Sequence, residues 1–135
     1  MTNVIIAGIG QTPVNEHWDT SLRELAFHAM EAAMQDAGGL RPTALYVGNM
    51  LAGQLSKQTQ LATLLADFAG LTGIEAATVE AAGASAAMAL RAGTMAVSSG
   101  MVDVAMVLGV EKLSEQVPAE VEAALAMSSD TDYEA

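Results

Sequence analysis

The chain has 135 residues, which fits a single domain because domains usually hold about 100–150 residues. It is 52% hydrophobic, but polar residues and glycines interrupt its apolar runs before they reach the about 18 residues that a membrane span requires. A formal net charge of −11, with only five scattered basic residues and no cysteine, argues against nucleic-acid binding and excludes disulfides, thiolate metal sites and a thiol nucleophile.

The first predicted element is a buried strand over residues 3–11, which are short, apolar and rich in β-branched side chains. No basic leader precedes it, so we expect no signal peptide and a cytoplasmic location. Residues 8–13, GIGQTP, begin like a dinucleotide fingerprint. Pro13 stands at the third glycine position and no helix is predicted there, so nucleotide binding is disfavoured.

A helix is predicted over residues 22–37. Ser21 and Glu24 form a capping-box pattern, and apolar residues then recur at helical spacing until Gly38 and Gly39. His17 precedes this helix and His28 lies inside it. Neither histidine has a metal-ligand partner at a useful spacing, so surface or helix-packing roles are favoured.

The rest of the chain alternates strands with helices. Strands are predicted at 44–51, 77–82 and 102–110, with a polar connection at 53–57 and helices at 61–68 and 84–99. The second of these helices has Arg91 as its only charged residue, which favours enclosure in a larger core. The pattern βαβαβαβ predicts a layered α/β fold with a mostly parallel sheet.

The composition changes after residue 110. Seven acidic residues against one lysine describe a solvated segment that holds at most a short helix over 119–127. We therefore divide the chain into an α/β core at 1–110 and an acidic segment at 111–135.

The junction at Gly83 is the candidate site. A helix begins directly after a strand there, and a helix N-terminus carries free N–H groups and a positive dipole end that stabilise an oxyanion. The alternative is that Gly83 only permits close packing or an unusual backbone angle. Glu80, in an otherwise apolar strand, is predicted to be buried and hydrogen-bonded, in a structural role more than a catalytic one.

Several segments in consistent order resemble the N-terminal domain of thiolases, especially the sterol-carrier-protein-type and archaeal ones. They are AGIGQTPV, AGQLSKQTQLATLLADFAGL, TVEAAGASAAMALRAGTMAVSSG and VDVAMVLGVEKLSE. Only the first half of that domain is covered, so the resemblance implies a thiolase-like fold that is incomplete without a partner chain. It also implies that residues 111–135 begin the loop that covers coenzyme A.

The resemblance places Gly83 at the position of the family's nucleophilic cysteine, where CASG becomes Gly83-Ala84-Ser85-Ala86. Without a thiol no covalent acyl intermediate forms on this chain. Ser85 lies two residues further on, with no visible base to activate it. Claisen-type acyl transfer then requires a nucleophile from the partner, unless the glycine was introduced by engineering.

The resemblance implies an acyltransferase subunit that takes a CoA thioester as substrate and needs no other cofactor. It implies a hetero-oligomer in which a second polypeptide completes the fold, with a dimer contact near Ala77–Ala82. Three alternatives stay open: a cysteine-independent aldolase-type lyase subunit, a non-catalytic structural subunit, and, least favoured, a free-standing nucleotide-binding domain.

Overall fold

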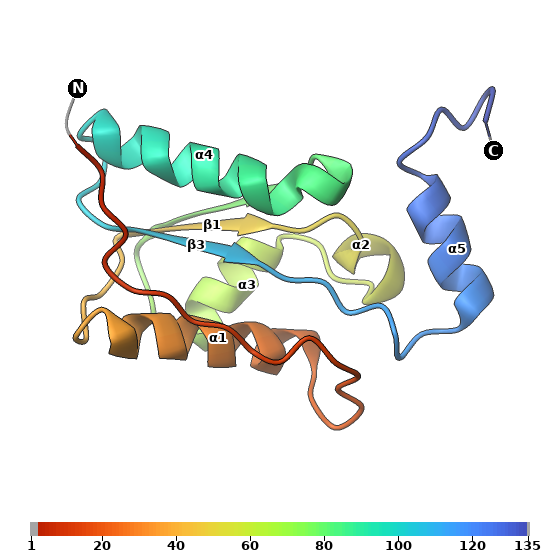
Figure 1. Cartoon of the computed structure of the whole chain (residues 1–135), viewed down its shortest axis with the longest axis horizontal. Helices are drawn as coiled ribbons and strands as arrows, with labels where there is room; N and C mark the ends of the chain where they lie inside the picture. The colour runs from red at the N-terminus through yellow and green to blue at the C-terminus, as the bar shows by residue number, and fades with distance from the viewer. Residues whose placement is uncertain (1–2, 135) are drawn as a thin grey trace.

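The computed structural model describes residues 3–134 and shows a parallel sheet between two layers of helices (Figure 1). The strands are ordered β2-β1-β3, and both pairings are parallel. Their bounds are Ala44–Gly48 for β1, Glu75–Val79 for β2 and Ala105–Gly109 for β3. The α/β class and the parallel sheet are therefore confirmed.

The helices cover opposite faces of the sheet. Helices α1 (Leu22–Asp36) and α3 (Leu61–Phe68) pack on one face and α4 (Ser85–Ser98) on the other. From β1 the chain steps to β2 on one side, and then crosses to β3 on the far side of β1. Right-handed crossovers in opposite directions place their helices on opposite faces. The remaining helices are α2 (Ala52–Leu55), the 3-10 turn η1 (Ala82–Ala84) and α5 (Pro118–Ala126).

The central strand β1 supplies the middle of the core, because all five of its residues are buried. Leu45 and Val47 point toward α1 and α3, where they join Met30, Leu61 and Leu65. The side chains of the alternate residues point the other way, and those of Ala44 and Tyr46 pack against α4. The Tyr46 hydroxyl donates a 2.6 Å hydrogen bond to Glu75 on β2, and burial together with this carboxylate raises the pKa of Tyr46 to about 12.

Local chemistry fixes the ends of α1 as predicted. The Ser21 hydroxyl accepts a hydrogen bond from the Glu24 amide at 3.3 Å, and the Glu24 carboxylate accepts one from the Ser21 amide at 2.8 Å. The hydrogen bonds from the Ser21 hydroxyl and amide hold the pKa of Glu24 below its ordinary value. Gly38 and Gly39 follow with φ of 69° and 84°, a left-handed conformation that ends the helix at little steric cost.

The predicted first strand at residues 3–11 is wrong. Residues 3–13 have no regular secondary structure, and in the described part of the chain no strand pairs with them. An apolar, β-branched run indicates that a segment tends to be buried. To form a strand it also needs a neighbouring strand with which its backbone groups can form hydrogen bonds.

Smaller differences concern element ends. The predicted strands at 44–51, 77–82 and 102–110 are each shorter in the structure, and β2 also begins two residues earlier than predicted, at Glu75. Helix α2 overlaps the polar connection predicted at 53–57. The predicted helix at 84–99 begins with the turn η1, and α4 buries only a narrow stripe, formed by Ser85, Ala89, Gly93 and Ala96. The short helix expected in the acidic segment is present as α5.

Among the described residues, no helix combines the length and hydropathy needed to cross a bilayer.

Glycines let α4 lie directly against the sheet. A Cβ atom built on Gly48, the last residue of β1, would come 2.5 Å from backbone atoms of Ser85 and Ala86. A Cβ atom on Gly109, at the end of β3, would come 2.7 Å from Ala86 Cβ. The first turn of α4 is therefore held against the carboxyl ends of two strands.

We predict that Gly48→Ala lowers the free energy of unfolding by about 1–3 kcal/mol, because the new methyl group must displace backbone atoms of α4. The matched control is Gly53→Ala in α2, where an added Cβ meets nothing within 4 Å. It should change stability by less than about 1 kcal/mol. Urea unfolding followed by circular dichroism measures both; equal losses would contradict the close packing at Gly48.

Candidate functional site

The candidate site lies where the carboxyl ends of the parallel strands meet. Asn49 follows β1 and ties two strand ends together: its Nδ2 donates to Val110 O at 2.8 Å, and its Oδ1 accepts from the Ala52 amide at 2.9 Å. Glu111, just after β3, accepts hydrogen bonds from the backbone amides of Met50 and Leu51. These contacts hold the loops after β1 and β3 in one arrangement.

The turn at Gly83 leads from the end of β2 into α4. Ala82 has a left-handed φ of 48°, which is uncommon for a residue with a side chain. The Glu80 carboxylate accepts a hydrogen bond from the Ala82 amide. Gly83 is exposed, and a Cβ atom built on it would meet nothing within 4 Å. This position has room for a side chain, so close packing does not require the glycine here.

The amino end of α4 is free of a side-chain cap. Its N-cap residue, Ala84, makes no side-chain hydrogen bond, and the preceding turn has none at its own N-cap either. The positive end of the helix dipole therefore lies beside Gly83, and the nearest bound carboxylate, that of Glu80, is on the Ala82 amide at the start of the preceding turn and not on α4 itself. Such an end can stabilise negative charge on a bound group.

Ser85 stabilises the turn that precedes α4 through hydrogen bonds to the backbone. Its hydroxyl donates to Ala82 O at 2.7 Å and accepts from the Ala81 amide at 2.9 Å, and the residue is 5% exposed. Both bonds go to backbone groups, and no histidine or carboxylate is among its hydrogen-bond partners in the described residues. Ser85 is thus a structural residue with no base to activate it.

Glu80 does not lie where the sequence placed it. It is exposed and follows β2, so the expectation of a buried carboxylate is wrong. Strand β2 ends at Val79, and the hydrogen bond from the Ala82 amide keeps the Glu80 carboxylate at the surface of the turn.

Neither histidine is bonded to the Gly83 turn. His17 Nε2 is 2.8 Å from Pro13 O, and His28 is exposed on α1 near Phe27.

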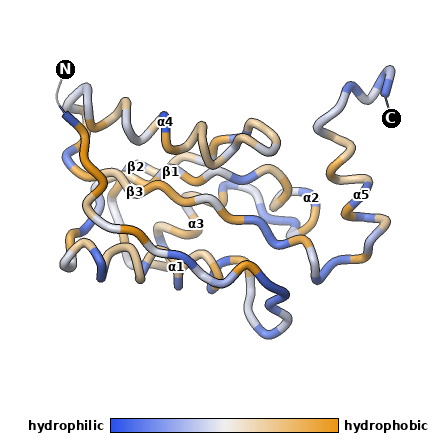
Figure 2. The backbone as a smooth tube through the Cα atoms, viewed as in Figure 1, coloured by the Kyte–Doolittle hydropathy of each residue, from blue (hydrophilic) through white to orange (hydrophobic). Residues whose placement is uncertain are grey.

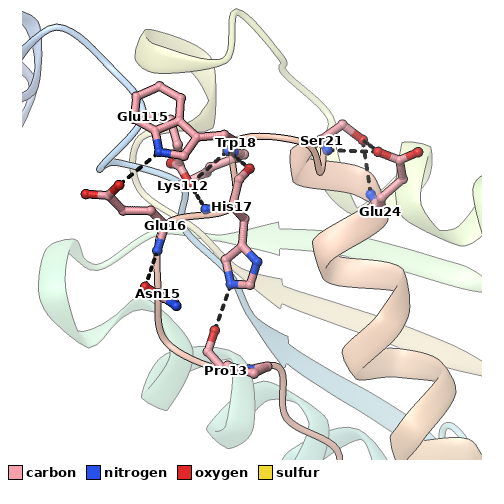
Figure 3. A network of polar contacts seen from close by, with 9 residues as sticks. All are labelled: Pro13, Asn15, Glu16, His17, Trp18, Ser21, Glu24, Lys112 and Glu115. Carbon is pink, nitrogen blue, oxygen red and sulfur yellow. Dashed lines mark hydrogen bonds and ion pairs between the residues drawn. The ribbon is translucent and has the colours of Figure 1, made fainter.

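A polar network links the loop around His17 to the segment after β3 (Figure 3). Lys112 Nζ donates to His17 O at 2.8 Å and forms an ion pair with Glu115 at 3.0 Å. Glu115 also accepts a hydrogen bond from the His17 amide. Nothing in the sequence signals this network, because His17 and Glu115 are 98 residues apart.

Burial is the largest influence on the Glu115 carboxyl and acts to raise its pKa, but the hydrogen bonds from His17 and Lys112 outweigh it and leave the pKa below its ordinary value. The side chain is 7% exposed, and its Oε2 has no partner among the described residues. In residues 3–134 no cluster of histidine, aspartate and glutamate has the arrangement of a metal site.

Comparison with known proteins places the sequence in a family. The family model described as "Thiolase, N-terminal domain" matches residues 4–134. The chain is 44% identical over 137 residues to the acetyl-CoA acetyltransferase of Methanothermobacter thermautotrophicus, and 42% identical to that of Methanocaldococcus jannaschii. Both alignments cover 100% of this chain but only 35% and 34% of the relatives, so the chain spans about one third of their length.

We predict that Gly83→Cys folds with a stability within about 0.5 kcal/mol of the natural chain, because the new side chain has open space. The uncapped helix end should hold the pKa of the thiol below its ordinary value of about 8.5. The control is Ser99→Cys at the opposite end of α4, where the dipole has the other sign. The chain has no other cysteine, so the pH dependence of alkylation by iodoacetamide compares the two thiols directly; equal profiles would contradict the effect of the helix end.

A second prediction concerns the Glu115 network. A carboxylate whose pKa is lowered on folding stabilises the fold above its ordinary pKa, here 4.5, and loses that effect as the pH falls through the folded value. Glu115→Gln should therefore lower the free energy of unfolding at pH 7, and the deficit should shrink below pH 4.5. Chemical unfolding between pH 7 and pH 3 measures it. Glu122→Gln, at an exposed position of α5, should show no such deficit at any pH.

Proposed function

Because the chain belongs to the thiolase N-terminal domain family, we propose that it is one part of a thiolase-like protein that binds acyl-CoA thioesters and acts on them beside a second polypeptide. The matched relatives carry the name acetyl-CoA acetyltransferase and are about three times longer. The observation that carries the proposal is the open turn at Gly83, where an uncapped helix begins at the carboxyl ends of a parallel sheet.

In this proposal Gly83 supplies only its backbone groups, and the position that a nucleophilic side chain would occupy is left open for the substrate. Acyl transfer through a covalent intermediate then needs a thiol from the second chain, since this chain has no cysteine and Ser85 is bound to backbone groups. The thioester itself is the substrate, and no further cofactor is proposed.

A thiol-independent reaction fits the same geometry. In cleavage of a 3-hydroxyacyl thioester, a base removes the hydroxyl proton, the Cα–Cβ bond breaks, and one fragment leaves as a carbonyl compound. The electron pair stays on the thioester as an enolate, which a proton then quenches at Cα. The positive end of the α4 dipole beside Gly83 is suited to stabilise this enolate, and the missing side chain leaves room for the acyl group.

We assign residues 1–110 to the α/β core and residues 111–135 to the start of the loop region over the bound thioester. We also assign a dimer contact to Ala77–Ala82. Two facts support that contact: β2 is an edge strand of the sheet, and the segment leads directly into the Gly83 turn. Exposed edges of this kind are ready to pair with another chain.

The second candidate is a non-catalytic structural subunit that keeps the fold to build an assembly. The absence of any cysteine and the backbone-bound Ser85 favour it. The two candidates differ in whether the assembled protein binds and turns over a CoA thioester.

The test uses the assembly purified from its native source. Native mass spectrometry should reveal a second polypeptide, and calorimetry should show binding of acetyl-CoA. Gly83→Cys should raise thiolysis of acetoacetyl-CoA at least about tenfold, about 1.4 kcal/mol in the barrier, while Ser99→Cys should not. Absence of thioester binding, with no gain from Gly83→Cys, would establish the structural subunit instead.

A further inference from the structure

The turn between β2 and α4 joins two fixed points. At its start, the carbonyl oxygen of Val79, the last residue of β2, accepts a hydrogen bond from the Asn49 amide at 3.2 Å. At its end, the backbone of Ser85 lies against Gly48, where a Cβ atom would come within 2.5 Å of it. Residues 80–84 must therefore connect two positions that are already set by the sheet and the helix.

Hydrogen bonds account for all but one of the five amides from Ala81 to Ser85. The first two donate to side chains: the Ala81 amide to the Ser85 hydroxyl at 2.9 Å, and the Ala82 amide to the Glu80 carboxylate. The fourth and fifth donate to carbonyl oxygens within the turn. Among the described residues, only the third amide, that of Gly83, has no partner.

Ala82 is the strained residue of the turn. Its φ of 48° is left-handed, a conformation in which Cβ crowds the following carbonyl oxygen and which residues with a side chain rarely adopt. Such a conformation persists only where surrounding contacts favour it. At Ala82 these contacts are the Glu80 carboxylate, which accepts from its amide, and the Ser85 hydroxyl, which donates to its carbonyl oxygen at 2.7 Å.

Glu80 has one contact in the described part of the chain, and it is the hydrogen bond from the Ala82 amide. The side chain is exposed and forms no ion pair with the described residues. It is also the only charged residue from Val79 to Leu90, and Figure 2 shows α4 in pale or orange colours along most of its length. The turn therefore has a single carboxylate, and that carboxylate is bound to the strained residue.

We propose that Glu80 is the positioning residue of the Gly83 turn. Its carboxylate holds Ala82 in the left-handed conformation and thereby fixes the direction in which Gly83 presents its unpaired amide. Glycine has the widest backbone freedom, so a change at Ala82 between two fixed ends is taken up mainly at Gly83. The inference rests on the proposed function for the use of the turn, which is to receive a thioester.

Two substitutions separate the hydrogen bond of Glu80 from its charge. Glu80→Gln keeps an oxygen that can accept from the Ala82 amide and removes the charge, whereas Glu80→Ala removes both. Both are made in the full chain that carries Gly83→Cys, whose single thiol reports on the turn. Because Glu80 is exposed, both variants should fold, which circular dichroism checks.

The pH dependence of alkylation by iodoacetamide is the measurement. With Glu80→Gln, the thiol of Gly83→Cys should keep a pKa below its ordinary value of about 8.5, because the turn still holds it beside the start of α4. With Glu80→Ala, the profile should move toward about 8.5, and alkylation at pH 7 should be at least about threefold slower than with Glu80→Gln. The control thiol of Ser99→Cys, at the opposite end of α4, should respond equally to both substitutions.

Rescue by glycine tests whether Glu80 acts through Ala82. Glycine adopts positive φ about as readily as negative φ, so adding Ala82→Gly to Glu80→Ala should recover most of the lost alkylation rate. In the chain that keeps Glu80, Ala82→Gly should change the rate by less than about twofold, because the left-handed conformation is already held there.

The outcomes separate this inference from the proposed function. Equal profiles for Glu80→Gln and Glu80→Ala, or a loss that Ala82→Gly does not recover, overturn the positioning role. A lower free energy of unfolding with an unchanged thiol profile also overturns it, because Glu80 would then only stabilise the fold. Alkylation needs no thioester, so a protein that binds no acetyl-CoA overturns the proposed function while the thiol profiles still decide the role of Glu80.

Discussion

The close approach of α4 to the sheet is the constraint on which the candidate site depends. Gly48 and Gly109 have no side chains, so the backbone at Ser85 and Ala86 rests on the ends of β1 and β3. This contact fixes where the helix begins and therefore where Gly83 presents its backbone. The hydrogen bonds of Asn49 and Glu111 then hold the neighbouring loops at the same edge. The candidate site at Gly83 thus depends on backbone positions and not on a reactive side chain.

The remaining features describe a fold that is only partly covered. Helix α4 buries one narrow stripe, β3 has a free edge, and the isoleucines of the N-terminal segment face solvent. Relatives that share this segment are about three times longer. Exposed apolar surface of this extent is typical of interfaces.

The sequence predicted well those elements whose signals are local. The capping box at Ser21, the helical repeat after it and the fully apolar strand at Ala44–Gly48 all depend on neighbouring residues. It failed where the outcome depends on distant partners: residues 3–11 lack a pairing strand, and the Glu115 network joins residues 98 positions apart. The location of Gly83 at a strand-to-helix turn was readable, whereas the open space around it required coordinates.

The hydrogen bond between Tyr46 and Glu75 also governs how β2 can meet another molecule. A slip of one residue between β1 and β2 would turn Tyr46 to the opposite face of the sheet and bury an unpaired phenol. The register of these two strands is thereby fixed, so the same backbone groups of β2 always face away from β1. Any chain that pairs there therefore meets the same outward amides and carbonyls each time.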